Sequence, residues 1–358
     1  MSEYWTELVH QLDPYVPGEQ PLDPQTTKLN TNENPYPPSA DVAKAIQGHA
    51  LDNLRLYPDP ESGALKQALA TYHKLDANQV FIGNGSDEVL AHCFQTFFKN
   101  LKPILFADIS YSFYPVYCAL YQIDYRTVAL DKAFCIDPAA YRQPNGGIII
   151  PNPNAPTGIA MPLDTIRELL DGNDSLVIID EAYVDFGAES AIELIADYAN
   201  LLVVQTFSKS RSLAGLRLGY ALGQPELIEG LNRIKNSFNS YPVGSLTSAA
   251  AIASLNDENY FQQCRARIIS TRNWLDNELV NLGFEVLSSS SNFLFAQHRL
   301  HPASRLYFEL KNAGILVRHF ESERINNYLR ISIGSEQECA VLVNTLKQLV
   351  KEPLINSE

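Results

Sequence analysis

The run 206–220, TFSKSRSLAGLRLGY, limits most strongly what this chain can fold into. It follows the apolar stretch 201–204, which is typical of a buried parallel strand. Lys209 therefore lies at the carboxyl end of a strand, between hydroxyl side chains, where a lysine contributes little to packing. An amine at the mouth of a sheet can be desolvated and act as a nucleophile toward an aldehyde.

A possible phosphate site is the second feature of the same run. Arg217 has a planar fork suited to a phosphate, and Thr206 and Ser208 can donate hydrogen bonds to the same anion. A cofactor that carries both an aldehyde and a phosphate ester is pyridoxal 5′-phosphate. For one lysine and one arginine taken alone, a solvated basic loop remains an equal alternative.

The chain length and composition favour a globular protein that binds neither nucleic acid nor membrane. Its 358 residues suffice for two domains, and the net charge of −14 disfavours nucleic acids and anionic membrane surfaces. The five scattered cysteines form no CxxC pair, which argues against a disulfide framework or a structural zinc site. No signal peptide or membrane-spanning run is evident, so we expect a cytoplasmic protein.

Three apolar strands are expected in succession, near residues 148, 177 and 202. Parallel sheets bind ligands beyond the carboxyl ends of their strands, and Asp180, Tyr183 and Lys209 follow such ends. Earlier in the chain, the turn 83–88 connects a short strand to a helix. Free backbone N–H groups converge at such a turn and attract anions, although many turns of this kind look alike.

The chain is expected to divide into three parts. After residue 223 long helices alternate with short strands, which predicts a second, smaller α+β domain. The proline-rich start is expected to form an arm that joins this small domain or a partner subunit. We therefore predict an arm (1–40), a large domain (41–245) and a small C-terminal domain (246–358). A helix is also expected over about 190–198.

Several motifs occur in an order that is more specific than any one of them: NENPYPPS, YPDPES, GNGSDE, SYSFY, NPNAPTG, DEAY, TFSKS, AGLRLGY, SNFLF, ILVR and YLRISIG. Over nearly the whole chain this set resembles the fold-type I pyridoxal-phosphate-dependent aminotransferases, and within them the branch that acts on histidinol phosphate. The resemblance implies an α/β fold with a mostly parallel central sheet covered by helices, a smaller α+β domain, and a homodimer.

The resemblance also implies roles for particular residues. Lys209 matches the lysine that binds the cofactor covalently, Asp180 the carboxylate at the pyridine nitrogen, and Tyr183 the tyrosine at the phenolic oxygen. Tyr111 matches the aromatic side chain stacked on the ring. The residues that match the phosphate site are Ser86, Asp87, Thr206, Ser208, Arg217 and, from the neighbouring subunit, Tyr57.

One position departs from the family pattern. Many relatives have an asparagine directly before Pro-Thr-Gly, where it bonds the phenolic oxygen, but here that place is Ala155. Either Asn154 or Asn152 takes over, or Tyr183 acts alone. We favour Asn154. A smaller departure is Ile109, where a proline often precedes the aromatic run.

The resemblance points to an anionic substrate. Arg330 matches the arginine that binds the substrate anion, and Arg318 matches a second arginine of the histidinol-phosphate branch; two forks suit a dianion. Asn32 and Tyr15 lie in stretches that border the substrate in the family. The alternatives are a surface salt bridge for Arg318 and arm packing for Tyr15.

The implied reaction interconverts L-histidinol phosphate and 2-oxoglutarate with imidazole-acetol phosphate and L-glutamate, in histidine biosynthesis. An aromatic amino acid aminotransferase and, less favoured, a threonine-phosphate decarboxylase share the same pattern. A non-catalytic regulator of this fold is disfavoured, because the chain is acidic and carries no helix-turn-helix extension.

Overall fold

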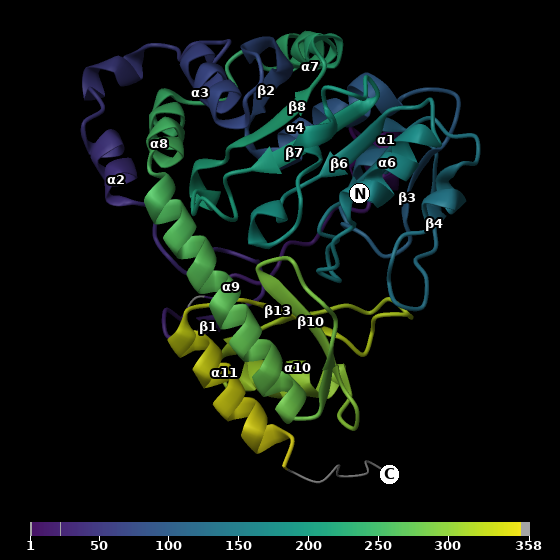
Figure 1. Cartoon of the computed structure of the whole chain (residues 1–358), viewed down its shortest axis with the longest axis vertical. Coiled ribbons are helices and arrows are strands. Elements are labelled where there is room, and N and C mark those ends of the chain that lie inside the picture. The colour runs from purple at the N-terminus through teal and green to yellow at the C-terminus, as the bar shows by residue number, and fades with distance from the viewer. Residues whose placement is uncertain (1, 22, 352–358) are drawn as a thin grey trace.

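Two β-sheets organise the fold, and the computed structural model describes residues 2–21 and 23–351. In Figure 1 the larger sheet lies in the upper part of the molecule and the smaller one in the lower part, and helix α9 (Glu258–Asn281) runs between them. Within the described ranges, no helix has the length and apolar character needed to cross a membrane.

The larger sheet contains seven strands, which lie side by side in the order β2 (Val80–Gly83), β8 (Gly219–Gly223), β7 (Leu201–Thr206), β6 (Val177–Asp180), β5 (Ile148–Pro151), β3 (Ile104–Ala107) and β4 (Tyr125–Val128). Strand β8 is antiparallel to both of its neighbours, and the other pairs are parallel. This mostly parallel sheet confirms the predicted α/β fold class. It also places the carboxyl ends of β5, β6 and β7 at one edge.

Helices cover both faces of this sheet, because its buried strands carry apolar side chains on both sides. Val177 and Ile179 of β6 pack in one core, whereas Ile178 packs in the other. The first core includes residues of α2 (Ala40–Gln47), α3 (Gly63–His73), α6 (Leu163–Asp171) and α8 (Ser245–Asn256). The second includes residues of α4 (Gly85–Cys93), α5 (Tyr114–Tyr121) and α7 (Pro225–Phe238).

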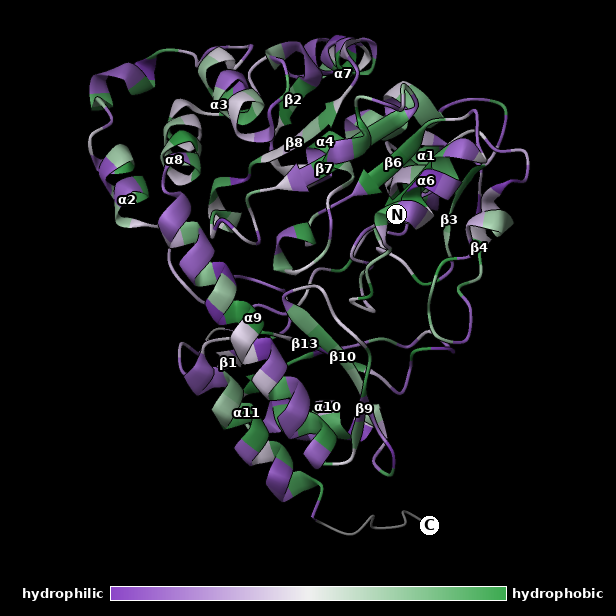
Figure 2. Cartoon of the chain, in the orientation of Figure 1, coloured by the Kyte–Doolittle hydropathy of each residue, from purple (hydrophilic) through white to green (hydrophobic). Residues whose placement is uncertain are grey.

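The smaller sheet is antiparallel, in the order β12 (Arg318–His319), β13 (Leu329–Ser332), β10 (Phe293–His298) and β9 (Phe284–Val286). Its core takes in apolar residues of α9, α10 (Ala303–Asn312) and α11 (Glu336–Leu349). Figure 2 shows hydrophilic and hydrophobic residues alternating along α9, as expected for a helix with one buried face. Ile268, Leu275 and Leu279 form part of that face.

The N-terminal segment lies against the C-terminal part of the chain. After the short helix α1 (Glu7–Gln11), strand β1 (Thr27–Lys28) pairs in parallel with β11 (Ile315–Leu316). Leu29, the next residue, is buried in the core beneath the smaller sheet. The predicted arm thus meets the small-domain elements of its own chain, while the division at residues 40 and 245 stays a prediction.

Local structure departs from expectation at one predicted helix. The helix expected over 190–198 is wrong, since only a 3₁₀ turn forms there, and the Glu181 carboxylate binds the Ser190 hydroxyl and the Ala191 N–H at its start. Helix α4 ends at Cys93 and continues as a π-helix. The remaining short elements are the π-helix Phe94–Phe98 and the 3₁₀ turns Leu51–Arg55, Ala77–Gln79, Pro138–Tyr141, Val184–Phe186, Ala191–Leu194 and Ala214–Leu216.

Candidate active site

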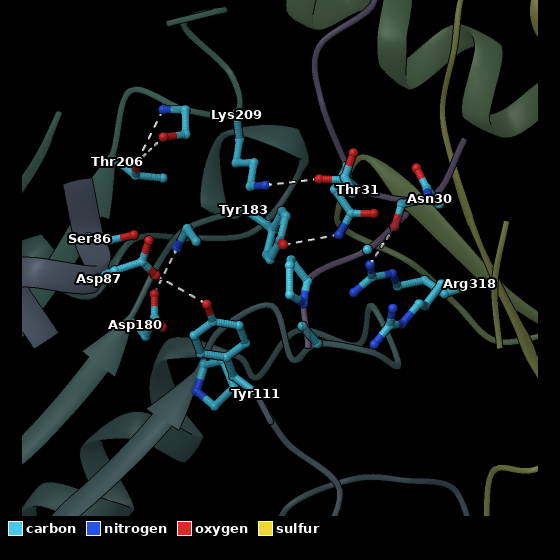
Figure 3. Close-up of a pocket in the computed structure, with 18 of the residues that line it drawn as sticks. Asn30, Thr31, Ser86, Asp87, Tyr111, Asp180, Tyr183, Thr206, Lys209 and Arg318 are labelled. Carbon is cyan, nitrogen blue, oxygen red and sulfur yellow. Dashed lines mark hydrogen bonds between the residues drawn. The ribbon is translucent and has the colours of Figure 1, made fainter. Parts of the chain in front are cut away.

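A cavity of about 350 Å³ lies beyond the carboxyl ends of β5, β6 and β7, facing β12 and β13 of the smaller sheet. Figure 3 shows side chains from both sheets and from the N-terminal segment pointing into it. Most of the residues that the sequence singled out line this cavity: Tyr15, Asn32, Ser86, Asp87, Tyr111, Asp180, Tyr183, Thr206, Ser208, Lys209, Arg217, Arg318 and Arg330.

Lys209 lies in the turn that follows β7, and its amine faces the cavity. Its Nζ donates a hydrogen bond of 3.2 Å to the carbonyl oxygen of Thr31 and lies 5.7 Å from the centre of the Tyr183 ring. The turn is held from the N-terminal segment, because Asn34 Nδ2 donates to the carbonyl oxygens of Lys209 and Ser210. The amine is thus positioned by backbone contacts and has no carboxylate among its hydrogen-bond partners in the described chain.

Asp180 ends β6 and is 5% exposed. Its carboxylate accepts hydrogen bonds from the Tyr114 hydroxyl at 3.0 Å and from the Ala182 N–H at 3.3 Å. Burial raises the pKa of Asp180 to about 6, while these two bonds act in the opposite direction. Within the described residues no lysine or arginine forms an ion pair with it, so this buried carboxylate suits a cationic ligand group.

The other end of the cavity is built from the start of α4 and the loop before β8. Gly85 has a φ of 81°, and a Cβ there would lie 2.6 Å from Arg217 Nη2. A Cβ on Gly219 would lie 2.3 Å from the backbone nitrogen of Ser86. These close approaches bring the helix N-terminus and a guanidinium to one place, which is the arrangement that binds a phosphate.

The Asp87 carboxylate orients two neighbours of this anion site. It accepts a hydrogen bond of 2.7 Å from Arg217 Nη2 and one of 3.2 Å from the Tyr111 hydroxyl. Next to this anion site, the Thr206 hydroxyl donates to the Ser208 hydroxyl at 3.0 Å and accepts from the Ser208 N–H at 3.1 Å. All five side chains line the cavity.

Arg318 and Arg330 are direct cross-strand partners on β12 and β13. Arg330 Nη2 donates to the Asn30 carbonyl oxygen at 3.0 Å, but its buried Nε has no hydrogen-bond partner among the described residues. Burial, and then the neighbouring Arg318 charge, lower the pKa of Arg330. Like charges placed directly opposite each other on a sheet are unfavourable, so the pair calls for an anion between the two forks.

Two predicted residues lie outside the cavity. Tyr57 is 82% exposed and stacks on Tyr241 with ring centres 4.8 Å apart. Asn154 is buried, and its amide nitrogen donates to the carbonyl oxygen of Ile109 and to the hydroxyl of Thr157. The side chain that reaches the cavity wall there is the methyl group of Ala155.

Asn152, the other candidate to replace the missing asparagine, is also engaged elsewhere. Its side chain donates to the carbonyl oxygen of Met161 and accepts from the Met161 N–H. Neither asparagine is therefore brought to the cavity wall.

Other residues of the site did not follow from the sequence. Tyr114 contacts Asp180, and its only signal was membership of the aromatic run SYSFY. Asn30 contacts Arg330, and Thr31 contacts Lys209, through their backbone carbonyl oxygens. Every residue has such an oxygen, so these contacts cannot be recognised from the sequence. Pro17, Gly18 and Gln20 of the N-terminal segment also line the cavity.

A second buried carboxylate, Glu181, lies directly behind the site. It accepts hydrogen bonds from Ser190 Oγ at 2.6 Å, the Ala191 N–H at 2.5 Å and Gln205 Nε2 at 2.8 Å. Burial raises the pKa of Glu181 to about 7, although these bonds lower it. Gln205 in turn accepts from the Tyr220 hydroxyl, so the carboxylate belongs to a polar network that extends away from the cavity.

Comparisons with known proteins agree on one family. The sequence family described as aminotransferase class I and II matches residues 24–346. A protein of Hydrogenovibrio crunogenus named histidinol-phosphate aminotransferase 1 is 56% identical over 352 residues, covering 98% of this chain and 99% of its own. A histidinol-phosphate aminotransferase of Clostridium botulinum is 52% identical over 353 residues, covering 98% of this chain and 100% of its own.

A solved structure shares the whole fold. The histidinol-phosphate aminotransferase of Sinorhizobium meliloti, crystallised in complex with pyridoxal 5′-phosphate, superposes with a TM-score of 0.86 at 25% sequence identity. The superposition covers 98% of each chain.

Proposed function

This chain belongs to the class I and II aminotransferases, and among them to the histidinol-phosphate aminotransferases, and we propose that it exchanges the amino group of L-histidinol phosphate with 2-oxoglutarate. The products are imidazole-acetol phosphate and L-glutamate, and the reaction belongs to histidine biosynthesis. The cofactor is pyridoxal 5′-phosphate, which the Sinorhizobium meliloti structure contains.

The residues of the cavity fit this cofactor. Among residues 2–21 and 23–351 the Lys209 amine has no ion pair with a carboxylate, and it can bind an aldehyde covalently. The buried carboxylate of Asp180 has no cationic side chain paired with it in the described chain, which suits a protonated ring nitrogen. The start of α4 and the Arg217 fork suit the phosphate, since a Cβ on Gly85 would fill the space between them.

Bound pyridoxal phosphate supplies an electron-accepting ring that makes the α-carbon of the substrate acidic. Within that chemistry, Lys209 Nζ would take the proton from the substrate α-carbon and pass it to the aldehyde-derived carbon of the cofactor, C4′. Asp180 keeps the proton on the ring nitrogen, and the Tyr183 hydroxyl donates to the ring oxygen. Tyr111 stacks on the ring face. The phosphate is held by Arg217, by the hydroxyls of Thr206 and Ser208, and by the N–H groups of Ser86 and Asp87.

The cross-strand pair Arg318 and Arg330 is the single observation that carries the choice of substrate. Two guanidinium groups beside one cavity, one of them with a buried and unpartnered Nε, fit a phosphate dianion better than a single carboxylate. Tyr15 packs against Phe113 with ring centres 5.0 Å apart and covers the same side of the cavity. The same arginines can bind the C1 carboxylate of 2-oxoglutarate in the second half of the reaction, because the phosphate-bearing arm of histidinol phosphate stands where an amino acid has its α-carboxylate.

A homodimer is part of the proposal. Tyr57 stands far out in solvent, on a loop that Lys235 fixes by donating to the Pro60 carbonyl oxygen at 2.8 Å. In a dimer, Tyr57 would reach the phosphate site of the partner subunit. Large apolar side chains that are exposed on the same stretch and near Tyr241 support an interface there: Leu51, Leu54, Leu56, Tyr57, Phe238 and Tyr241. The five cysteines are all free, which supports a reducing, cytoplasmic location.

A half-reaction screen tests this function. The cofactor-loaded protein is mixed separately with L-histidinol phosphate, phenylalanine and tyrosine, and the visible absorbance of the cofactor is followed. We expect kcat/KM to be highest for histidinol phosphate. A higher value for phenylalanine would favour an aromatic aminotransferase, and release of CO₂ without an oxo-acid would favour a decarboxylase. Reduction with borohydride should leave a pyridoxyl adduct on Lys209, and an adduct on another lysine would contradict the assignment.

A further inference from the structure

The wall of the cavity lacks an amide beside Tyr183 on the side where the family pattern has one. Ala155 presents a methyl group there, and the amide of Asn154 is turned away to Ile109 and Thr157. The hydrogen of a tyrosine hydroxyl can rotate unless a hydrogen bond to a neighbouring group fixes its direction. The structure supplies such a partner from a distant part of the chain.

Asn32 is that partner. Its side-chain Nδ2 donates a hydrogen bond of 3.0 Å to the Tyr183 hydroxyl, and the residue is 1% exposed. In Figure 3 this bond is the dashed line that ends at the Tyr183 hydroxyl. Asn32 has a φ of 56°, a left-handed conformation that asparagine tolerates better than most residues. No other hydrogen bond to the Tyr183 hydroxyl occurs in residues 2–21 and 23–351.

Ser332 fixes which end of the Asn32 amide faces Tyr183. The Asn32 N–H donates to Ser332 Oγ at 2.8 Å, and Ser332 Oγ donates to Asn32 Oδ1 at 2.8 Å. With the serine proton on Oδ1, the NH₂ end of the amide faces the tyrosine. The Tyr183 oxygen therefore accepts, and its own proton is left to donate to another group.

Every polar group of Asn32 has a protein partner. The carbonyl oxygen accepts from Asn292 Nδ2 at 2.9 Å. The backbone N–H and Oδ1 bind Ser332, and Nδ2 binds Tyr183. Asn32 also lines the cavity, so the contact with the substrate expected from the sequence stays a prediction. The bonds to Ser332 tie Asn32 to β13, the strand that carries Arg330 two residues before Ser332.

We propose that Asn32 is a positioning residue that aims the Tyr183 hydroxyl at the phenolic oxygen of the cofactor, in place of the asparagine absent at position 155. This inference rests on the proposed function, because it needs pyridoxal phosphate bound at Lys209. The bond from Asn32 holds the tyrosine proton toward the ring oxygen and polarises the hydroxyl. Through Ser332, the same contact joins this oxygen to the strand that binds the substrate anion.

The experiment measures the pH midpoint of the visible absorbance band of the cofactor-loaded protein. A hydrogen bond to the phenolic oxygen stabilises negative charge on it, so weakening that bond moves the midpoint to higher pH. We expect Asn32→Gly, which keeps the left-handed backbone, to raise the midpoint by about half a pH unit or more. Ser332→Ala should shift it in the same direction by a smaller amount, since the amide is then less firmly held.

A double variant separates positioning from a general structural effect. If Asn32 acts through Tyr183, then Asn32→Gly added to Tyr183→Phe produces no further shift. Gln122→Gly is a matched control, because Gln122 has the same φ of 56° and lies outside the cavity. It should leave the midpoint unchanged, whatever it does to the unfolding free energy.

Two results would overturn the inference: an unshifted midpoint in both Asn32→Gly and Ser332→Ala, or fully additive shifts in the double variant. A wild-type protein that shows no visible band with pyridoxal phosphate would instead refute the proposed function. The two failures are therefore distinguishable in one set of spectra.

Discussion

The hydroxyl of Tyr114 donates a hydrogen bond to Asp180 Oδ2 over 3.0 Å, and both side chains are buried. Tyr114 begins α5 and packs its ring near Phe94 and Phe106. Burial raises the pKa of Asp180, and the bond from Tyr114 opposes that rise. Tyr114 thus helps to keep Asp180 ionised at neutral pH, as contact with a protonated ring nitrogen requires.

Removal of this hydroxyl is expected to weaken cofactor binding in a pH-dependent way. In Tyr114→Phe the ring packing stays, but the pKa of Asp180 rises further above 6. A protonated Asp180 must lose its proton before it can pair with the ring, so affinity for pyridoxal phosphate should fall more at pH 6 than at pH 8. We expect kcat to fall about tenfold at neutral pH. Equal loss of affinity at both pH values would contradict this explanation.

Glu181 should make the cofactor-free protein less stable as the pH rises. Its pKa is raised from 4.5 to about 7 by burial, so the folded chain holds a proton that the unfolded chain releases. The stabilisation is complete below pH 4.5 and is lost as the pH rises through 7, by up to about 1.4 kcal/mol per pH unit. Urea unfolding of Glu181→Gln and wild type from pH 5 to 7 should show a flatter slope for the variant. Parallel slopes would show that Glu181 does not titrate in this range.

The arginine pair should determine preference for a phosphorylated substrate. Each charge-assisted hydrogen bond contributes about 1.5–3 kcal/mol, so Arg330→Ala should lower kcat/KM for histidinol phosphate on the order of 100-fold. Arg330→Lys keeps the charge but loses the fork, and should fall between this variant and wild type. L-Histidinol, which lacks the phosphate, is the control substrate. The kcat/KM for L-histidinol should change little. An equal loss of kcat/KM for both compounds would mean that the arginines do not act by binding the substrate phosphate.

Mixed dimers can test whether Tyr57 acts across a subunit interface. Lys209→Ala and Tyr57→Ala subunits are each expected to be impaired alone. If Tyr57 completes the partner's site, a heterodimer contains one site with both residues intact. Random mixing should then restore about a quarter of all sites. Activity no greater than the sum of the separate variants would mean that Tyr57 acts within its own subunit or not at all.

Much of the fold could be predicted because buried parallel strands and amphipathic helices leave periodic patterns. Asp180 and Lys209 end predicted strands, and the structure brings them to one cavity. Strand β8 was not expected, since its sequence GYALG follows directly on the lysine loop and gives no sign that it runs antiparallel. Strand β4 lies at the sheet edge, and Tyr125, Arg126 and Thr127 are exposed, so its apolar signal is weak.

The interior of the site was less predictable than its outline. Asn154 was favoured by its position next to Ala155, yet its amide is needed inside the loop by Ile109 and Thr157. Asn32 is expected to border the substrate and does line the cavity, but its hydrogen bonds to Ser332, Tyr183 and Asn292 did not follow from the sequence. Which side chain bonds to which is decided by packing between segments far apart in the chain, and a single sequence does not record it.

The hydrogen-bonded residues Asn32 and Ser332 are 300 positions apart in the sequence. Strand β1 likewise pairs with a strand, β11, that is synthesised much later. On the ribosome, the segment that contains Asn30, Thr31 and Asn32 is synthesised long before β13 and can dock only after β13 has left the exit tunnel. Catalytic competence therefore arises only after residue 332 has been synthesised. A nascent chain stalled before residue 332 can carry the lysine and the aspartate and still lack a finished pocket.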